Sequence, residues 1–165
     1  MEMLKKAIEG IRPIDPEIGP KLQRRLDFLT KPPGSLGRIE ELALWYGSAR
    51  GEIKPVLGKK AVAVFAADHG IAAEGVSAYP KEVTAQMVYN FLRGGAAINA
   101  IARQIGADVV VVDIGVDHDF QPVSGLRIRK VAKGTANMIS GPAMSREEAL
   151  KAVSEGIVLA QELGQ

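Results

Sequence analysis

The sequence contains no cysteine among its 165 residues, which excludes disulfide frameworks, zinc–cysteine sites and thiol nucleophiles. It also lacks a strong charge of either sign, because 21 lysines and arginines face 19 acidic residues. This balance, with no run of basic residues, gives no indication of a nucleic-acid partner. No apolar stretch reaches the roughly 20 residues of a membrane span, and the first residues have no apolar core of a signal peptide. We therefore expect a cytoplasmic protein with no membrane or nucleic-acid partner.

What the sequence does have is an ordinary globular composition, with 47% hydrophobic and 24% charged residues. Its length suits one full domain, or one domain with a short appendage. Near residue 59 the pattern changes from helical spacing with polar joints to a continuous apolar run, which predicts two parts. Residues 1–58 are expected to be an N-terminal helical segment. Residues 59–165 are expected to be an α/β core that is incomplete at its C-terminal end, because a strand–helix pattern that stops on a helix normally continues with another strand.

The first 50 residues have helical spacing interrupted by polar joints. Asp15 and Pro16 predict the start of a helix, with the aspartate as cap and the proline in the first turn. Two prolines exclude helix within Lys31–Arg38. Ser35 is then placed to cap a following helix whose apolar side includes Ile39.

Two apolar runs, residues 60–67 and 108–115, predict strands. Both are short, rich in β-branched residues and without alternation, which is typical of strands buried on both faces of a parallel sheet. Residues 80–93 and 96–104 are predicted helices between them, and such a strand–helix–strand crossover is right-handed. A weaker strand is predicted over residues 126–130. Ser145 and Glu148 have the spacing of a capping box at the start of a last helix.

Polar residues follow both strong strands. The first ends in Asp68 and His69, and the second runs through Asp113 to Asp117. Ligands of open α/β sheets bind at the carboxyl ends of the strands. Asp68 and His69 are therefore either a proton-handling or substrate-orienting pair, or plain turn residues. A metal site is a weaker interpretation, because the sequence has only two histidines and no spaced ligand motif.

Two glycine-rich segments could approach a phosphate. Gly94-Gly95 lacks the spacing of a P-loop or a dinucleotide fingerprint, so a tightly packed helix break is the favoured interpretation. The second region precedes the last helix and includes Gly134, Thr135 and Asn137. A helix N-terminus suits an anion, but Ser145 as a simple cap explains the same region equally well.

Several of these segments, in this order and spacing, also carry a family resemblance. They are Lys31–Arg38, Ala67–Ile71 with Glu74–Val76, Tyr79–Met87, Asn90–Asn99, Val112–Val116, Gly134–Met138 and Gly141–Ser145. Together they resemble the N-terminal half of nicotinate-nucleotide:dimethylbenzimidazole phosphoribosyltransferases. The resemblance covers the chain from about Ile14 onward.

The resemblance implies an α/β fold with a Rossmann-like parallel sheet flanked by helices. The helices before residue 59 would belong to a small helical domain, and the assembly would be a homodimer. The implied reaction moves phosphoribosyl from nicotinate mononucleotide to a benzimidazole-type base, 5,6-dimethylbenzimidazole. It gives α-ribazole 5′-phosphate and nicotinate in cobalamin lower-ligand synthesis, and it implies no cofactor and no metal.

The resemblance also suggests site residues. The implied base-binding residues are Asp68, His69, Tyr79, Gln86 and Met87. The implied phosphate- or nucleotide-binding residues are Gly134, Thr135 and Asn137. The family's general-base glutamate lies in the half that this chain does not match, so the catalytic residue is left unassigned, and the accepted base is left open.

Two alternatives stay open at this stage. One is a non-catalytic base-binding module from a split or truncated gene. The other is an unrelated hydrolase that uses Asp68, His69 and Asp113 around a metal.

Overall fold

The structure is a computed structural model that describes residues 2–164. The chain divides into two compact units, Ile8–Gly58 and the rest of the chain. The first helix, α1 (Glu2–Glu9), spans the boundary between them.

The helical unit, Ile8–Gly58, contains α2 (Ile18–Asp27) and α3 (Arg38–Arg50). Its buried apolar contact joins Leu22 of α2 to Gly47 of α3. A Cβ atom at Gly47 would lie 2.7 Å from the Leu22 Cδ1 atom, so glycine is what permits the close approach of these helices. Ile39, on the apolar face expected for α3, is exposed, and the buried residues of this helix are Glu40 and Gly47.

Both helices of this unit begin later than predicted. Asp15 does not cap α2; its Oδ1 accepts a hydrogen bond from the Glu17 backbone N–H at 2.9 Å, within the turn before the helix. The prediction that Ser35 caps α3 is also wrong. The Ser35 N–H donates to the Pro32 carbonyl at 3.1 Å, and α3 starts only after Gly37.

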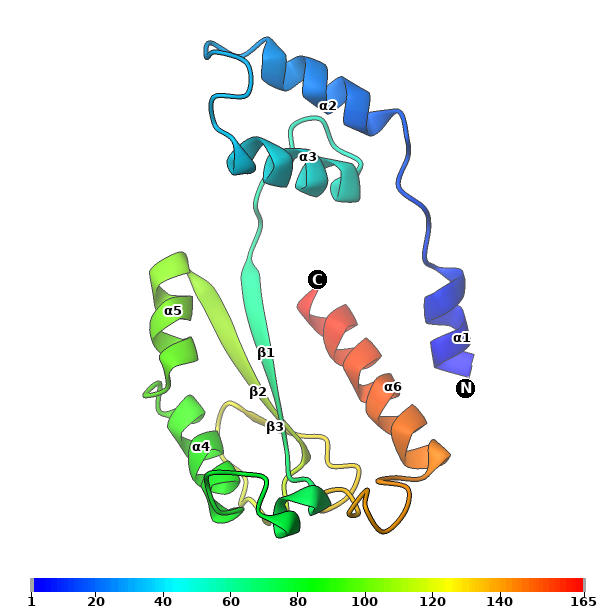
Figure 1. Cartoon of the computed structure of the whole chain (residues 1–165), viewed down its shortest axis with the longest axis vertical. Helices are drawn as coiled ribbons and strands as arrows, with labels where there is room; N and C mark the ends of the chain where they lie inside the picture. Colours follow the sequence, from blue (N-terminus) through cyan, green and yellow to red (C-terminus); the bar gives the residue numbers. More distant parts are fainter. Residues whose placement is uncertain (1, 165) are drawn as a thin grey trace. The chain divides into compact units, whose positions relative to one another are not determined.

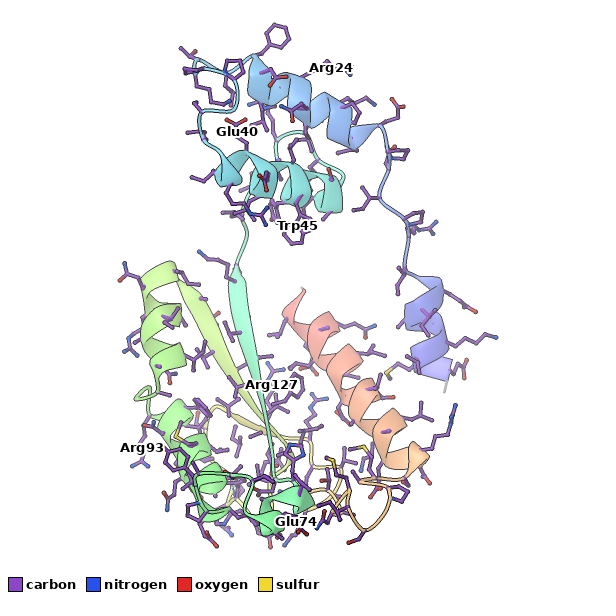
Figure 2. All side chains as sticks on the ribbon, in the orientation of Figure 1. Arg24, Glu40, Trp45, Glu74, Arg93 and Arg127 are labelled. Carbon is purple, nitrogen blue, oxygen red and sulfur yellow. The ribbon has the colours of Figure 1, made fainter. Side chains whose placement is uncertain are left out.

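The proline-containing joint Lys31–Arg38 is held by a buried glutamate. Glu40, labelled in Figure 2, is only 7% exposed. Its Oε1 accepts hydrogen bonds from Lys31 Nζ at 2.8 Å and from the Leu36 N–H at 3.0 Å. The Lys31 ammonium group, followed by the Leu36 N–H, holds the pKa of Glu40 below its ordinary value. Glu40 therefore joins both ends of this segment to the first turn of α3.

The other unit is built on a parallel sheet, as predicted. Its strands β1 (Lys60–Ala67), β2 (Ala107–Gly115) and β3 (Leu126–Ile128) lie in the order β1-β2-β3. Helices α4 (Glu82–Leu92) and α5 (Ala97–Ile105) lie on one side of the strands, and α6 (Arg146–Leu163) lies on the other (Figure 1). A short 3-10 helix, η1 (Gly70–Glu74), follows β1.

β3 is shorter than the predicted 126–130 strand. Past Ile128, single backbone hydrogen bonds still join the chain to β2, from Arg129 to Asp113 at 2.9 Å and from Val131 to Ile114 at 2.9 Å.

The core of the unit lies between the sheet and α4. Ala66 of β1, Val88 of α4 and Val111 of β2 pack with Val116 and Phe120, which follow β2. The Phe120 ring also makes an edge contact with Tyr89, with their centroids 5.4 Å apart. The residues just after β2 are therefore fixed by packing as well as by the strand itself.

The prediction that both strong strands are buried on both faces holds for β2 and is wrong for β1. Val111 and Val112, on opposite faces of β2, are each 1% exposed. Phe65 of β1 is 44% exposed, and Ala61 and Ala63 are exposed as well. The reason is position: β2 lies between two strands, whereas β1 is at an edge of this sheet.

The capping box of α6 is confirmed. Ser145 Oγ accepts the Glu148 N–H at 3.1 Å, and Glu148 Oε2 accepts the Ser145 N–H at 2.7 Å. Hydrogen bonding from the Ser145 backbone N–H, and then from its side chain, lowers the pKa of Glu148. Arg127, labelled in Figure 2, and Arg129 pair with Glu162 near the other end of α6. No helix within residues 2–164 has the length and apolar character needed to cross a membrane.

Candidate functional site

The carboxyl ends of β1 and β2 lie at the same edge of the sheet, because the two strands are parallel. Asp68, directly after β1, is 6% exposed. Its Oδ2 accepts the Asp117 N–H at 2.7 Å, and its own N–H donates to the Gly115 carbonyl at 3.0 Å. These two hydrogen bonds join the end of β1 to the last residue of β2 and to the loop that follows it. His69 is exposed beside it, at the start of η1.

Asp113 is the second carboxylate at this edge, and its side chain is fully buried. Its Oδ1 accepts the Val116 N–H at 2.9 Å. Its Oδ2 forms an ion pair with Lys130 Nζ at 2.7 Å and has no hydrogen-bond partner among the described residues. The same ammonium group donates to the carbonyls of Val116 and His118. The partly buried Lys130 ammonium group and the fully buried Asp113 carboxylate therefore hold the loop of residues 116–118.

Two exposed ion pairs surround these buried groups. Lys81, which precedes α4, pairs with Asp117, and Lys133 pairs with Asp119 at 2.6 Å. Each pair lowers the pKa of its aspartate and raises the pKa of its lysine, mainly through the side-chain hydrogen bond. The pair of Lys81 and Asp117 links the loop after β2 to the start of α4.

A cavity of about 470 Å³, here called the α4 cavity, opens between the end of β1 and the start of α4. Four of the residues suggested from the sequence as base-binding line this cavity: Asp68, His69, Tyr79 and Met87. Apolar side chains dominate the rest of the lining, which also includes Ile71, Val76, Val83 and Thr84. Gln86 is exposed on α4 and does not line this cavity. The helix turns by about 100° per residue, and Gln86 lies on the exposed side of α4, away from Met87.

A second cavity, of about 600 Å³ and here called the α6 cavity, shares Asp68 and His69 with the first. Gly134 and Thr135 line it, together with the capping residues Ser145 and Glu148 at the start of α6. The remaining lining is largely apolar.

Asn137, the third predicted phosphate-binding residue, lines neither of these cavities. Its amide donates to Glu74 Oε1 at 2.5 Å and so joins the loop to η1. Its suggested role at a phosphate stays a prediction.

The loop at residues 134–137 crosses the end of β1 at very short range. A Cβ atom at Gly70 would lie 2.5 Å from the backbone of Ala136 and Asn137. The Gly70 N–H also donates to Thr135 Oγ1 at 3.2 Å. Glycine at this position is therefore a packing requirement, which the sequence alone did not indicate.

Three lysines at this edge of the sheet were not identified from the sequence: Lys81, Lys130 and Lys133. Lys81 lies within the segment Tyr79–Met87, in which only Tyr79, Gln86 and Met87 were expected to bind a ligand. Lys130 and Lys133 have no local pattern, because their partners Asp113 and Asp119 are 17 and 14 positions away in the chain. Only the folded loop brings them together.

The two cavities can accept a flat, largely apolar ligand, since ligand sites are concave and mostly apolar with a few convergent polar groups. The alternative hydrolase needs Asp113 at the solvent edge beside Asp68 and His69. Asp113 is buried and paired with Lys130, so this arrangement is not formed. No group of three or more potential metal-ligating side chains is found within residues 2–164.

Comparison with known proteins supports the family resemblance. A family model described as phosphoribosyltransferase matches residues 11–165. A nicotinate-nucleotide–dimethylbenzimidazole phosphoribosyltransferase of Geobacter sp. (strain M21) is 56% identical over 97% of this chain and 46% of its own length. The relative of the same name from Geobacter sulfurreducens is 57% identical over 98% of this chain and 46% of its own length.

Two solved structures from Thermus thermophilus have the same fold. The crystal structure of a protein titled as this phosphoribosyltransferase superposes with a TM-score of 0.80 at 54% identity, over 84% of this chain and 42% of that one. A structure titled CobT superposes with a TM-score of 0.84 at 50% identity, over 90% of this chain and 45% of that one. The chain spans about half the length of the relatives it matches, and it belongs to this phosphoribosyltransferase family.

Proposed function

We propose that this chain supplies the base-binding part of an enzyme that transfers phosphoribosyl from nicotinate mononucleotide to 5,6-dimethylbenzimidazole. The products would be α-ribazole 5′-phosphate and nicotinate, in the synthesis of the lower ligand of cobalamin. The observation that carries the proposal is the α4 cavity at the carboxyl end of β1, lined by Tyr79 and Met87 in a chain of this family. The homodimer implied by the family resemblance is part of the same proposal.

The chemistry assigns separate tasks to the two reacting rings. The C1′–N bond to nicotinate breaks and its electron pair returns to the pyridine nitrogen, so this leaving group needs no proton. A benzimidazole nitrogen forms the new bond to C1′, and the ring then loses its N–H proton to a base. The ribosyl carbon becomes cation-like as the first bond breaks, which favours an electrostatically organised site.

The cavity residues suit recognition better than proton transfer. Thioether and aromatic side chains such as Met87 and Tyr79 provide favourable contacts for a flat heterocycle. The carboxylates that line the two cavities are Asp68 and Glu148. Asp68 accepts the Asp117 N–H and Glu148 accepts the Ser145 N–H. Both are thus engaged in holding the backbone, and we infer that the proton acceptor comes from the part of the relatives that this chain does not span.

The test is reconstitution. This chain is produced together with the remaining part of the Geobacter sulfurreducens relative, and release of nicotinate from nicotinate mononucleotide is followed by chromatography with and without 5,6-dimethylbenzimidazole. The expected result is base-dependent nicotinate release by the pair and none by this chain alone. Absence of transfer by a folded, associated pair would contradict the enzymatic proposal and favour the non-catalytic base-binding module.

Met87→Ala tests the location of the base within the reconstituted pair. It is expected to raise the KM for 5,6-dimethylbenzimidazole more than it lowers kcat, because it removes a contact made before the chemical step. Met3→Ala is the matched control, since Met3 lies outside the residues that the family model matches. An unchanged KM with reduced stability would instead place Met87 in the core, where Met→Ala typically costs about 2–5 kcal/mol.

A further inference from the structure

The two glycines between α4 and α5 form a tight helix end that has no part in the function proposed above. The Gly94 N–H donates to the Phe91 carbonyl at 3.1 Å, and the Gly95 N–H donates to the Asn90 carbonyl at 3.0 Å. Gly94 has a φ of 77°, in the left-handed conformation with which many helices end. The prediction of a tightly packed helix break at these glycines is therefore confirmed.

Gly95 packs directly on the side chain of Asn90, which lies in the last turn of α4. A Cβ atom at Gly95 would lie 2.4 Å from the Asn90 Oδ1 atom and 3.4 Å from its Cγ atom. The φ of Gly95 is not positive, so the backbone conformation alone does not require glycine at this position. Glycine is needed here because the Asn90 amide occupies the space of a side chain.

The other end of the Asn90 amide contacts Met87, one helical turn earlier. Its Nδ2 atom donates a hydrogen bond to the Met87 sulfur at 3.9 Å. Thioether sulfur is a weak acceptor, and residues three apart lie side by side on a helix, which brings the two groups together. Met87 lines the α4 cavity, whereas Asn90 lines neither the α4 cavity nor the α6 cavity. The amide therefore acts on the cavity through Met87.

Side chains of α5 hold the glycine turn from its other side. Asn99, which is only 8% exposed, donates from Nδ2 to the Phe91 carbonyl at 3.1 Å. Arg103 donates from Nη1 to the Gly94 carbonyl at 3.0 Å. The backbone turn that packs on Asn90 is thus fixed by both helices.

We infer that Asn90 is a positioning residue for the base that this chain is proposed to bind. Its amide, placed by Gly95, holds the Met87 thioether in one position on the wall of the α4 cavity. Methionine has three rotatable bonds and adapts to ligands of different shape, and such adaptable surfaces bind promiscuously. A held thioether gives the wall a fixed shape, so Asn90 determines how well the cavity distinguishes bases of different size. The inference rests on the proposed function, because it takes the base to bind against Met87.

The first measurement needs no ligand and follows the methionine methyl groups by NMR. The full chain is isotopically labelled at the methyl groups of its five methionines, and the Met87 signal is the one that disappears in Met87→Leu. In Asn90→Leu the side chain keeps its branch but has no donor, and in Gly95→Ala the added Cβ atom displaces the amide. We expect both substitutions to move the Met87 methyl signal toward the shift of free methionine, in which the rotamers are averaged.

Gly156→Ala is the matched control for Gly95→Ala. Gly156 lies in α6 of the same unit, and a Cβ atom at this glycine meets nothing within 4 Å. The control adds the same methyl group without touching Asn90, so its Met87 signal should coincide with that of the parent. Circular dichroism verifies that each variant folds. Gly95→Ala changes no side chain of α4, so it carries the test if Asn90→Leu does not fold.

The second measurement follows base selectivity in the reconstituted pair of this chain and the remaining part of the Geobacter sulfurreducens relative. KM and kcat are determined for 5,6-dimethylbenzimidazole and for benzimidazole without the two methyl groups. An apolar pocket of fixed shape distinguishes ligands that differ by one methylene by about 10–200-fold. We expect Asn90→Leu and Gly95→Ala to reduce the ratio of the two KM values by about threefold or more. The kcat for 5,6-dimethylbenzimidazole should change by less than about twofold.

A double substitution shows whether Asn90 acts through Met87. In the Met87→Ala background, Asn90→Leu should not change the ratio of the two KM values further, because the side chain that Asn90 positions is gone. Independent effects of the two substitutions would place the action of Asn90 elsewhere in the protein.

Three results would overturn the inference. One is a Met87 methyl signal that coincides with that of the parent in both Asn90→Leu and Gly95→Ala. Another is a ratio of KM values that both substitutions leave unchanged. The third is an effect of Asn90→Leu that persists in the Met87→Ala background. A parent pair that makes no product would instead refute the proposed function, and the methyl signals would still decide whether Asn90 holds Met87.

Discussion

Replacing Lys130 with methionine tests the buried ion pair at the edge of the sheet. The methionine side chain keeps the length of the lysine stem but leaves the fully buried Asp113 carboxylate without its cation. Removing one partner of a buried pair typically costs about 3–5 kcal/mol, because the remaining charge is uncompensated. The substitution also removes two hydrogen bonds, to the carbonyls of Val116 and His118. We expect a loss of about 3–5 kcal/mol in the free energy of unfolding.

Lys133→Met is a closely matched control. Lys133 lies three positions later in the chain and also pairs with an aspartate, Asp119, at 2.6 Å. Its side chain is 51% exposed and that of Asp119 is 74% exposed. Exposed pairs contribute about 0–1 kcal/mol, so this variant should be nearly as stable as the parent.

The assay is urea denaturation followed by circular dichroism, which reports on helices throughout the chain. The one tryptophan, Trp45, belongs to the helical unit. Its fluorescence provides a separate signal from that unit in the same experiment. Equal losses for the two lysine variants would refute the reasoning. So would a Lys130→Met variant that loses no stability, because this result would show that Asp113 needs no cation beside it.

The remaining predictions concern packing, capping and pH. Gly70→Ala should destabilise the α/β unit by about 1–3 kcal/mol through overpacking against the backbone of residues 136–137, whereas Gly141→Ala, with open space around it, should be nearly neutral by the same urea assay. Ser145→Ala should cost about 0.5–2 kcal/mol by removing the cap of α6, and a loss below that range would show that the cap is dispensable. The lowered pKa of Glu40 means that its stabilising contribution is present above the ordinary glutamate pKa of about 4.3 and is lost as the pH falls through the lower folded value. Trp45 fluorescence during denaturation should show this loss below about pH 4.3 in the parent and not in Glu40→Gln; an identical pH profile for both would contradict it.

The sequence was most informative where a pattern is local. The periodic helices, the two apolar strands and the capping box of Ser145 and Glu148 depend on neighbouring residues, and the structure contains all of them. Parallel pairing of β1 and β2 then placed Asp68 and Asp113 at one edge, as predicted.

Predictions from the sequence failed where the outcome depends on what packs nearby. The apolar run of β1 predicts burial on both faces, but an edge position leaves Phe65 exposed. Ser35 has the right residue type for a cap, but the turn through Gly34 and Gly37 delays the helix to Arg38.

The site was only partly predictable for the same reason. Tyr79 and Met87 line one cavity with Asp68 and His69, whereas Gln86 and Asn137 lie outside the lining of both cavities. The buried pair of Asp113 and Lys130 depends on a loop conformation that no local pattern in the sequence specifies.

The central claim is that a flat base binds at the carboxyl end of β1, in the α4 cavity. Titration of the isotopically labelled chain with 5,6-dimethylbenzimidazole, followed by two-dimensional NMR of the backbone amides, tests it most directly. The account predicts that the largest shifts cluster at Asp68, His69 and residues 79–87. Shifts confined to the helical unit Ile8–Gly58, or no shifts up to the solubility limit of the base, would contradict it.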